Sequence, residues 1–356
     1  MRWRTARFVA LLFLLCLGVS ETFSQQTQNP EEMHTPRTEI SRNRLADLHR
    51  SAEDGDGKAQ FELGSIYMSG SGVSQDYQQA AKWYERAAEH GFAPAQFELG
   101  SIYMFGLGVS QDYQQAAKWY ERAAEHGFAA AQFMMGFVYE QGKGVRRDYA
   151  RALNYYRSAA EQGHITAANN LATLYLHGQG ARKNIGTALK WYQFSAEHGS
   201  ATGQCNLGTL YFDGDGVPKD YHEAARWFRV AAEQGFPPAE NKLAFLYFMG
   251  QGVVQNYGEA VEWMSRAAEQ GYAQAQINLG DLYVEGKGVS LDYVAAYMWY
   301  CLGSADPRAA ARIRNLSGLI TYKQRIEGGN RASTWLSSHQ NQEVSDEKAG
   351  IALKVD

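Results

Sequence analysis

The sequence predicts an all-α fold: a right-handed α/α solenoid (superhelix) of about seven 36-residue helix-turn-helix repeats with capping helices. The first observation behind this prediction is an internal repeat, because the stretch from Ala59 to Gly91 returns at Ala95–Gly127 almost unchanged and then in weaker copies until about residue 306. The second is a tyrosine that recurs at 36-residue intervals, at Tyr67, Tyr103, Tyr139, Tyr175, Tyr211, Tyr247 and Tyr283. The third is a tryptophan in the same register, at Trp83, Trp119, Trp191, Trp227, Trp263 and Trp299, with Tyr155 in the one remaining copy. A period of roughly 20 to 50 residues is the sequence signature of a stacked repeat array.

Each repeat is expected to form two antiparallel helices. The first helix of the first copy is expected over Ala59–Ser69, where apolar residues recur at helical spacing. The Gly70-Ser71-Gly72 turn ends it, because glycine adopts the left-handed conformation of a helix end without a Cβ penalty. Asp76 opens the second helix as N-cap, and Gln79 three residues later predicts a capping box. Gly91 ends that helix, and Phe92 fits the hydrophobic contact of a Schellman turn.

The repeat resembles that of a known family. The string A-x3-LG-x2-Y-x2-G-x-GV-x2-DY-x2-A-x2-WY-x2-AA-x2-G is similar to the Sel-one-like repeat (SLR), a relative of the tetratricopeptide repeat with a longer loop between its helices, and the similarity covers about residues 41–306. Two copies depart from it, with Ala181, Asn184 and Ile185 in the fourth and Gly203 in the opening alanine position of the fifth. These departures predict a slightly looser or kinked joint around residues 180–205. Members of the family act as adaptors in envelope regulation, polysaccharide export, host contact and protein degradation, so the resemblance implies a scaffold.

The segments outside the repeats have their own predicted roles. Residues 1–24 carry an arginine-bearing start and an apolar run of about eleven residues, which predicts a secretory signal peptide cleaved near Ser20 or Ser24 and hence a secreted or periplasmic protein. An uncleaved anchor is the alternative. Residues 25–40 are predicted to be a disordered leader, residues 41–58 an N-terminal capping helix, and residues 59–306 the solenoid. Residues 307–338 are expected to form C-terminal capping helices, with Thr321 and Gln324 as a capping box and Gly328-Gly329 interrupting the last helix, and residues 339–356 a flexible tail.

No reactive constellation is found in the sequence. The net charge of −4 and the pI near 6.2 argue against a nucleic-acid partner. Cys205 and Cys301 lie two repeats apart, beyond disulfide reach in a solenoid. The cysteine pattern of the cysteine-rich SLR branch, which has been linked to penicillin-like compounds, is absent. His90, His126 and His198 each precede the glycine that ends a helix. A cation is mildly favoured at a helix C-terminus, so these histidines indicate polar helix ends rather than a metal site. We therefore predict no catalytic residue, no metal and no cofactor.

The first helices offer the best predicted binding face. Positions i, i+3 and i+7 share one side of a helix, and three such rows run along the repeats. The predicted partner-binding residues in these rows are Asn170, Asn206 and Asn278, Phe105, Phe137, Phe245 and Met249, and His177 and Asp213. Asparagine both donates and accepts, which suits an extended peptide backbone, and the larger side chains supply apolar contacts. The alternative is that these are exposed positions free to vary.

Two functions follow. The first is an exported non-catalytic scaffold or adaptor that binds a protein or peptide partner on the concave face of the superhelix, with no stable membrane span after signal cleavage. The second is an envelope-associated hydrolase, of cell-wall or β-lactam type, with a site between repeats that involves a polar residue such as His177 or Asp213. Turnover of an envelope substrate would distinguish the second from the first.

Overall fold

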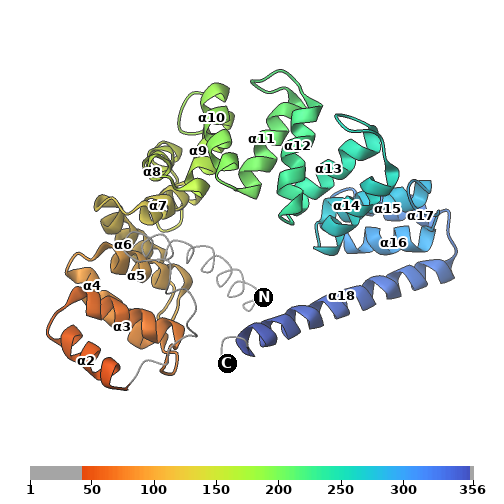
Figure 1. The fold of residues 1–356 in the computed structure, drawn as a ribbon. Helices are drawn as coiled ribbons and strands as arrows, with labels where there is room; N and C mark the ends of the chain where they lie inside the picture. The colour runs from red at the N-terminus through yellow and green to blue at the C-terminus, as the bar shows by residue number, and fades with distance from the viewer. Residues whose placement is uncertain (1–41, 353–356) are drawn as a thin grey trace, which may run out of the picture. The chain divides into compact units, whose positions relative to one another are not determined.

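The computed structural model describes the backbone of residues 42–352 and the side chains of residues 43–339. The signal peptide and leader predicted for residues 1–40 lie outside this range. The described residues form 17 helices and no strand (Figure 1). The prediction of an all-α solenoid is therefore confirmed.

The chain divides into two compact units, with the boundary between Trp191 and Tyr192. The first unit contains α2 (Arg42–Glu53), α3 (Gly57–Ser69), α4 (Tyr77–Glu89), α5 (Ala93–Phe105), α6 (Tyr113–Glu125), α7 (Ala129–Gln141), α8 (Tyr149–Glu161), α9 (Ile165–His177) and the start of α10 (Ile185–Glu197). The second contains the end of α10, α11 (Ala201–Asp213), α12 (Tyr221–Glu233), α13 (Pro237–Met249), α14 (Tyr257–Glu269), α15 (Ala273–Glu285), α16 (Tyr293–Leu302), α17 (Ala309–Ser317) and α18 (Tyr322–Ala352). In each unit the odd-numbered helices up to α15 are the first helices of the repeats and the even-numbered helices from α4 to α16 are the second.

The predicted helix ends are confirmed in detail. Gly70 caps α3 in the left-handed region, at φ 71°. At the end of α4 the N–H of Gly91 donates to the carbonyl of Ala88 at 3.0 Å, and the N–H of Phe92 donates to that of Ala87 at 3.2 Å. This pair of bonds is a Schellman motif, and the ring of Phe92 packs on Phe61 with centroids 5.3 Å apart.

The capping of the second helices differs from the prediction in one respect. The carboxylate of Asp76 accepts from the N–H groups of Gln78 and Gln79, as an N-cap should. The backbone N–H of Asp76, which a capping box would pair with the Gln79 side chain, donates instead to the carbonyl of Tyr67 at 2.9 Å. The same bond recurs in all seven repeats, up to Asp292 and Tyr283 at 3.1 Å. The backbone carbonyl of the tyrosine that marks the sequence register thus ties the end of each loop back to the first helix of its repeat.

The second glycine of the loop is required by a contact between neighbouring repeats at Gly108, Gly144, Gly180, Gly252 and Gly288. A Cβ on Gly108 would lie 2.6 Å from the carbonyl carbon of Tyr77, at the start of α4. The residue also has a positive φ of 67°, which disfavours any side chain. The G-x-G pair is therefore structural, as its sevenfold repetition predicts.

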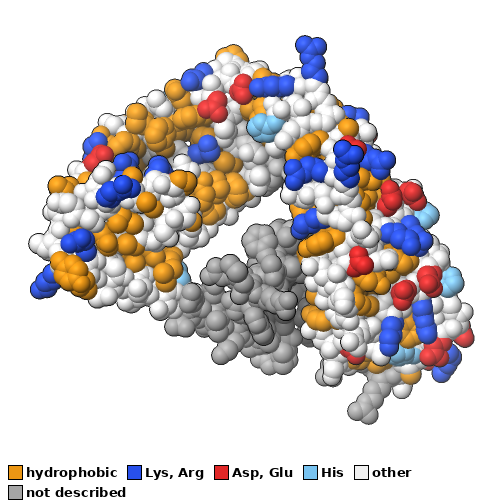
Figure 2. All heavy atoms as spheres, turned by 180° about the vertical axis from the view of Figure 1, so that it is seen from behind, with side chains coloured by type: hydrophobic (Ala, Val, Ile, Leu, Met, Phe, Trp, Pro, Cys, Tyr) orange, Lys and Arg blue, Asp and Glu red, His pale blue; other side chains and the backbone are white. Residues whose placement is uncertain are grey.

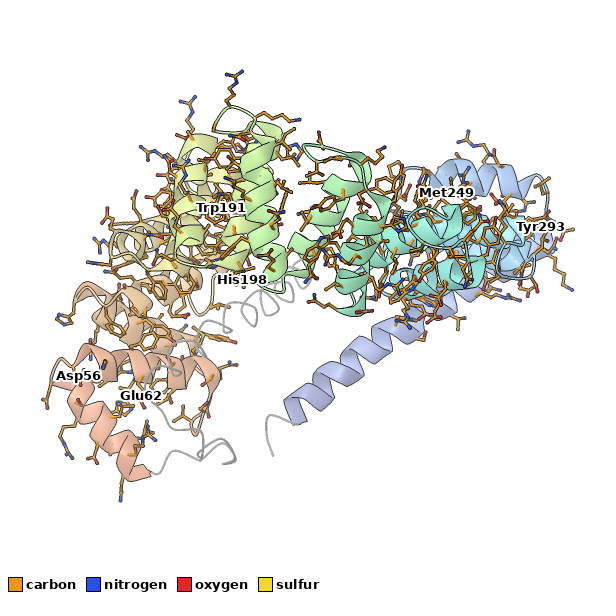
Figure 3. The ribbon with its side chains drawn as sticks, turned by 45° about the horizontal axis from the view of Figure 1, so that its top comes forward. Asp56, Glu62, Trp191, His198, Met249 and Tyr293 are labelled. Atoms are coloured by element: carbon orange, nitrogen blue, oxygen red, sulfur yellow. The ribbon has the colours of Figure 1, made fainter. Side chains whose placement is uncertain are left out.

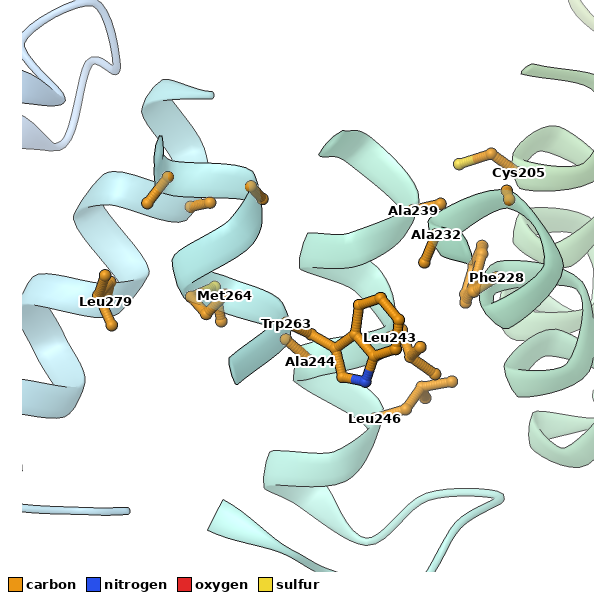
Figure 4. Close-up of a cluster of buried hydrophobic side chains, with 14 of the residues drawn as sticks. Cys205, Phe228, Ala232, Ala239, Leu243, Ala244, Leu246, Trp263, Met264 and Leu279 are labelled. Atoms are coloured by element: carbon orange, nitrogen blue, oxygen red, sulfur yellow. The ribbon is translucent and has the colours of Figure 1, made fainter. Parts of the chain in front are cut away.

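The core of each unit lies between stacked helix pairs and consists of several clusters of buried side chains. In the first unit Trp119 of α6 belongs to one buried cluster with Leu99 of α5, the first helix of the same repeat, and with Tyr84 of α4, the second helix of the preceding repeat. In the second unit Phe228, Leu243 and Trp263 make the equivalent cluster (Figure 4). Contacts of this kind join each repeat to its neighbour, which is why a single repeat cannot bury its apolar face alone.

The capping segments show three differences from the prediction. Helix α3 begins at Gly57 rather than at Ala59, because Asp56 caps it by accepting from the N–H groups of Lys58 and Ala59. Helix α18 runs unbroken through Gly328. A Cβ at this position would lie 3.0 Å from the carbonyl oxygen of Val294, so the glycine allows α18 to approach α16 closely. The stretch predicted as a tail from residue 339 continues this helix as far as Ala352.

The remaining C-terminal predictions are confirmed. Helix α17 covers the predicted helical stretch. The N–H of Thr321 donates to Oε1 of Gln324 at 2.9 Å, and the N–H of Gln324 donates to Oγ1 of Thr321 at 3.3 Å. This reciprocal pair is a capping box.

Candidate interaction surface

The first-helix face consists of three rows, each with one residue per repeat. The first row contains Glu62, Glu98, Met134, Asn170, Asn206, Lys242 and Asn278; the second contains Ser65, Ser101, Phe137, Thr173, Thr209, Phe245 and Asp281; the third contains Ser69, Phe105, Gln141, His177, Asp213, Met249 and Glu285. Figure 3 labels Glu62 at one end of the first unit and Met249 in the second.

The second row is largely structural. Ser101 is only 4% exposed, and its hydroxyl lies 3.0 Å from that of Tyr120 on the second helix of the repeat. The hydroxyl of Tyr84 donates to Ser65 in the same way at 3.1 Å. In the last repeat the hydroxyl of Tyr300 donates to Asp281. A buried phenol needs such a partner, so these row positions serve the stack rather than a ligand.

The two phenylalanines of the second row lack this function. Phe245 stands opposite Met264, which has no hydroxyl to satisfy, and the Phe245 side chain is 40% exposed. Its ring meets Phe212 edge to face, with centroids 6.1 Å apart. Phe137 is half-buried, and the hydroxyl of Tyr156 opposite it donates to Glu140 at 2.6 Å instead. Phe137 instead contacts Lys143, whose Nζ lies 5.3 Å from the ring centroid.

The third row is the most exposed of the three. His177 and Asp213 are exposed, Met249 is 46% exposed, and Phe105 is half-buried. Met249 lies one turn beyond Phe245 on α13, so the two side chains share a face. We call Phe212, Phe245 and Met249 the α13 patch. Figure 2 shows that hydrophobic side chains also reach the surface elsewhere, between polar and charged ones.

The predicted asparagines are half-buried and engaged within the chain. The amide of Asn278 donates to Asn241 at 2.9 Å, and its oxygen accepts from Arg308 at 3.1 Å. The oxygen of Asn170 accepts from Asn169 at 3.3 Å. Asn206 is half-buried at the equivalent position of α11. A peptide backbone would have to compete with these bonds, so the asparagines are weaker candidates than the sequence indicates.

The charges of the first row differ between neighbouring repeats. Glu62 is paired with Arg44 of α2 at 3.3 Å. Glu98, one repeat on, is half-buried, and burial raises the pKa of its carboxyl to about 7. Burial raises the pKa of the Tyr84 phenol, and the nearby charge of Glu98 raises it further.

One repeated feature lies outside the sequence predictions: a glutamine at a fixed position of the first helix, buried in most copies. The side chain of Gln204 donates to the carbonyl of Ala196 at 3.1 Å and accepts from Gln234 at 2.7 Å, so it closes the end of the preceding second helix. Glutamines at the equivalent position donate to the end of the preceding second helix in four other repeats, at Gln60, Gln96, Gln132 and Gln276. The signal was a glutamine at one fixed position of the repeat, which is unusual for a buried site.

The described residues offer no arrangement for metal or nucleophilic chemistry. No group of three or more His, Cys, Asp or Glu side chains that could hold a metal ion occurs among them. Burial raises the pKa of the Cys205 thiol to about 11, which keeps it protonated, and Cys301 is also a free thiol. His177 and Asp213, the polar residues of the hydrolase alternative, belong to different units and are each exposed. No helix in this part of the chain has the length and apolar character of a membrane span.

Comparison with known proteins identifies the repeat. The model of the Sel1 repeat matches residues 57–92, 93–128, 129–164, 165–200, 201–236, 237–272 and 273–305. A solved structure of a protective antigen of uropathogenic Escherichia coli, described as having an SLR fold, is 32% identical with a TM-score of 0.66, over 83% of this chain and 71% of that one. A Sel1 repeat protein from Oxalobacter formigenes is 32% identical with a TM-score of 0.65, over 80% of this chain and 83% of that one. No curated protein shows significant similarity. Sel1 repeat proteins generally mediate protein–protein interaction, and their fold is typically non-catalytic. With seven matched repeats over more than half of its length, the chain belongs to the Sel1 repeat family.

Proposed function

We propose that this protein is an exported, non-catalytic scaffold that binds a protein or peptide partner on its first-helix face. The observation that carries the proposal is the α13 patch. Phe245 and Met249 keep 40% and 46% of their surface exposed although they lie side by side on a rigid helix. Large exposed side chains of this kind are typical of the anchors around which protein interfaces are centred.

The patch is well placed to bind without rearrangement. Phe245 is held from below by the ring of Phe212, and α13 is held between α12 and α14. An anchor on a packed helix loses little conformational entropy on binding, which favours affinity. The partner expected here offers an apolar side chain to the patch.

The test uses two matched variants of the full chain. Phe245→Ser with Met249→Ser removes the patch, whereas Leu291→Ser removes an apolar side chain that is 56% exposed outside the three rows. Each protein is tagged, incubated with a cell-envelope extract and cross-linked, and the captured proteins are quantified by mass spectrometry. We expect partners that the wild type and Leu291→Ser capture and that the double variant loses by tenfold or more. Equal capture by all three folded proteins would refute the proposal.

The exported and non-catalytic parts of the proposal have separate tests. The N-terminal run of residues 1–24 supports export, so the secreted or periplasmic protein is expected to begin at Glu21 or Gln25. Recovery of that protein with Met1 intact would contradict cleavage. Assays with a chromogenic β-lactam and with cell-wall fragments are expected to show no turnover. Turnover that His177→Ala abolishes would favour the hydrolase instead.

A further inference from the structure

Arginines from the segments that flank the repeats contact residues of the first-helix face. In the first unit, Arg44 of α2 contacts the first-row residue Glu62, with Nη2 and Oε1 3.3 Å apart. In the second unit, Arg308, just before α17, donates from Nη1 to the first-row Asn278 at 3.1 Å. Arg312 of α17 pairs with the neighbouring second-row Asp281 at 2.8 Å. The face thus accepts guanidinium groups wherever a capping element brings one within reach.

Glu98 is the acidic residue of the first row that no capping element serves. It is equivalent to Glu62 in the next repeat, where α4 takes the place that α2 has in front of α3. Among the residues that the structure describes, Glu98 has no ion pair and no hydrogen-bond partner. The nearby phenol of Tyr84 already donates to Ser65 at 3.1 Å, so it does not serve this carboxylate.

An unpaired carboxylate in this position is costly for the free protein. Glu98 is half-buried, and the adjacent first-row residue Met134 is only 9% exposed. Removing a charged group from water without a partner costs free energy, which is why burial raises the pKa of Glu98 to about 7. A cation supplied from outside would recover this cost. Guanidinium suits the site best because it is weakly hydrated, permanently charged and able to bind a carboxylate with two parallel hydrogen bonds.

We propose that Glu98 binds an arginine side chain of the partner, in the way that Glu62 binds Arg44. The inference rests on the proposed function, because it assumes that a protein or peptide occupies the first-helix face. It adds the chemical class of the partner: a segment that presents an arginine to the first unit.

The test identifies peptide ligands first and then changes both sides of the contact. A phage library of random dodecapeptides is selected against the full-length mature chain, and the strongest peptides are synthesised with arginine or with citrulline, which has the same shape and no charge. Their affinities for the wild type, Glu98→Gln and the control Glu62→Gln are measured by fluorescence anisotropy. Circular dichroism confirms that all three proteins are folded.

We expect the selected peptides to be enriched in arginine. The citrulline substitution should weaken binding to the wild type by about tenfold and binding to Glu98→Gln by less than twofold, because the charge partner is then already missing. Glu62→Gln should bind the arginine peptide within twofold of the wild type, since Glu62 is occupied by Arg44.

Selected peptides without arginine enrichment, or with only lysine enrichment, would overturn the arginine site. So would an affinity that Glu98→Gln leaves unchanged. These outcomes leave the scaffold proposal standing, because it is tested separately at the α13 patch. Failure to select any peptide would count against peptide binding on this face altogether, and against the arginine site with it.

Discussion

Replacing Gly203 with alanine would place a methyl group against Ser195, 2.7 Å from its Cβ. Six of the seven repeats have alanine at the position of Gly203, and serine replaces alanine at Ser195, so the two departures compensate each other in volume. Overpacking of this kind costs about 1–3 kcal/mol, whereas glycine to alanine within a helix gains about 1 kcal/mol. We therefore expect Gly203→Ala to be less stable than the wild type by up to about 2 kcal/mol.

The second substitution should reverse this loss. Ser195 is 0% exposed, and its hydroxyl has no hydrogen-bond partner among the described residues. Ser195→Ala removes that unsatisfied group, which costs about 1–3 kcal/mol when buried, and it also makes room for the new methyl group. The double variant should consequently be at least as stable as the wild type, with a coupling between the two sites of about 1–3 kcal/mol.

Urea unfolding of the wild type, both single variants and the double variant closes a thermodynamic cycle. Hydrogen exchange of peptides from α11 adds a local measurement, which a repeat array requires because its unfolding need not be two-state. Single-variant effects that add within about 0.5 kcal/mol would refute the compensation. Gly203→Ala that is more stable than the wild type would show that helix propensity outweighs the contact.

Three further predictions use the same repeat logic. Glu240 occupies the position of the buried glutamines and accepts a hydrogen bond from Gln270 at 2.8 Å. As a carboxylate it cannot donate to the backbone carbonyl at the end of the preceding second helix, as the glutamines do. Glu240→Gln should therefore stabilise the protein by about 1 kcal/mol in urea unfolding. Burial raises the pKa of Glu240, so the wild type loses stability as the pH rises from about 4.5 through the raised pKa. The stability gained by Glu240→Gln should therefore grow over this pH range, and a constant gain would contradict the assignment. His164 accepts a hydrogen bond from the N–H of Ala167 at 3.2 Å, and burial lowers its pKa. The stability of the protein should therefore fall as the pH drops below about 6.5 toward the lowered pKa. His164→Phe introduces the residue that three other repeats have at this position, and it should flatten this dependence in thermal melts at pH 5 and pH 8. Deletion of residues 95–130 removes one of two nearly identical copies and places Pro94 directly before Ala131. It should give a folded, less stable protein with unchanged helicity per residue; an insoluble product or a non-cooperative melt would show that the copies are not interchangeable.

Most of the fold could be predicted because its determinants are local and repeated. The left-handed glycine at Gly70, the N-cap at Asp76 and the Schellman turn at Gly91 depend on a few adjacent residues, and seven copies in one register make each pattern unambiguous. The errors lie where a distant partner competes with the local rule. The Asp76 N–H bonds to the Tyr67 carbonyl rather than to Gln79, and Gly328 serves contact with α16 rather than a helix break. The first contact joins the two helices of one repeat and the second joins α18 to α16, so neither can be read from the residues next to the cap or to the glycine.

The candidate surface could be predicted in outline but not residue by residue, because row position alone does not distinguish exposed side chains from structural ones. The distinguishing signal lies 19 residues further on. At Tyr84, Tyr120 and Tyr300 of the second helices, the second row has a serine or aspartate that hydrogen-bonds to the phenol. Tyr156 is an exception, because its phenol donates to Glu140 and the row has Phe137. Where it has Met264, the row has Phe245, which satisfies nothing and stays exposed. Residues whose type is set by such a pairing are explained by the stack. Phe245, Met249 and Glu98 have no such explanation, and it is therefore at these positions that selection for a partner should be sought.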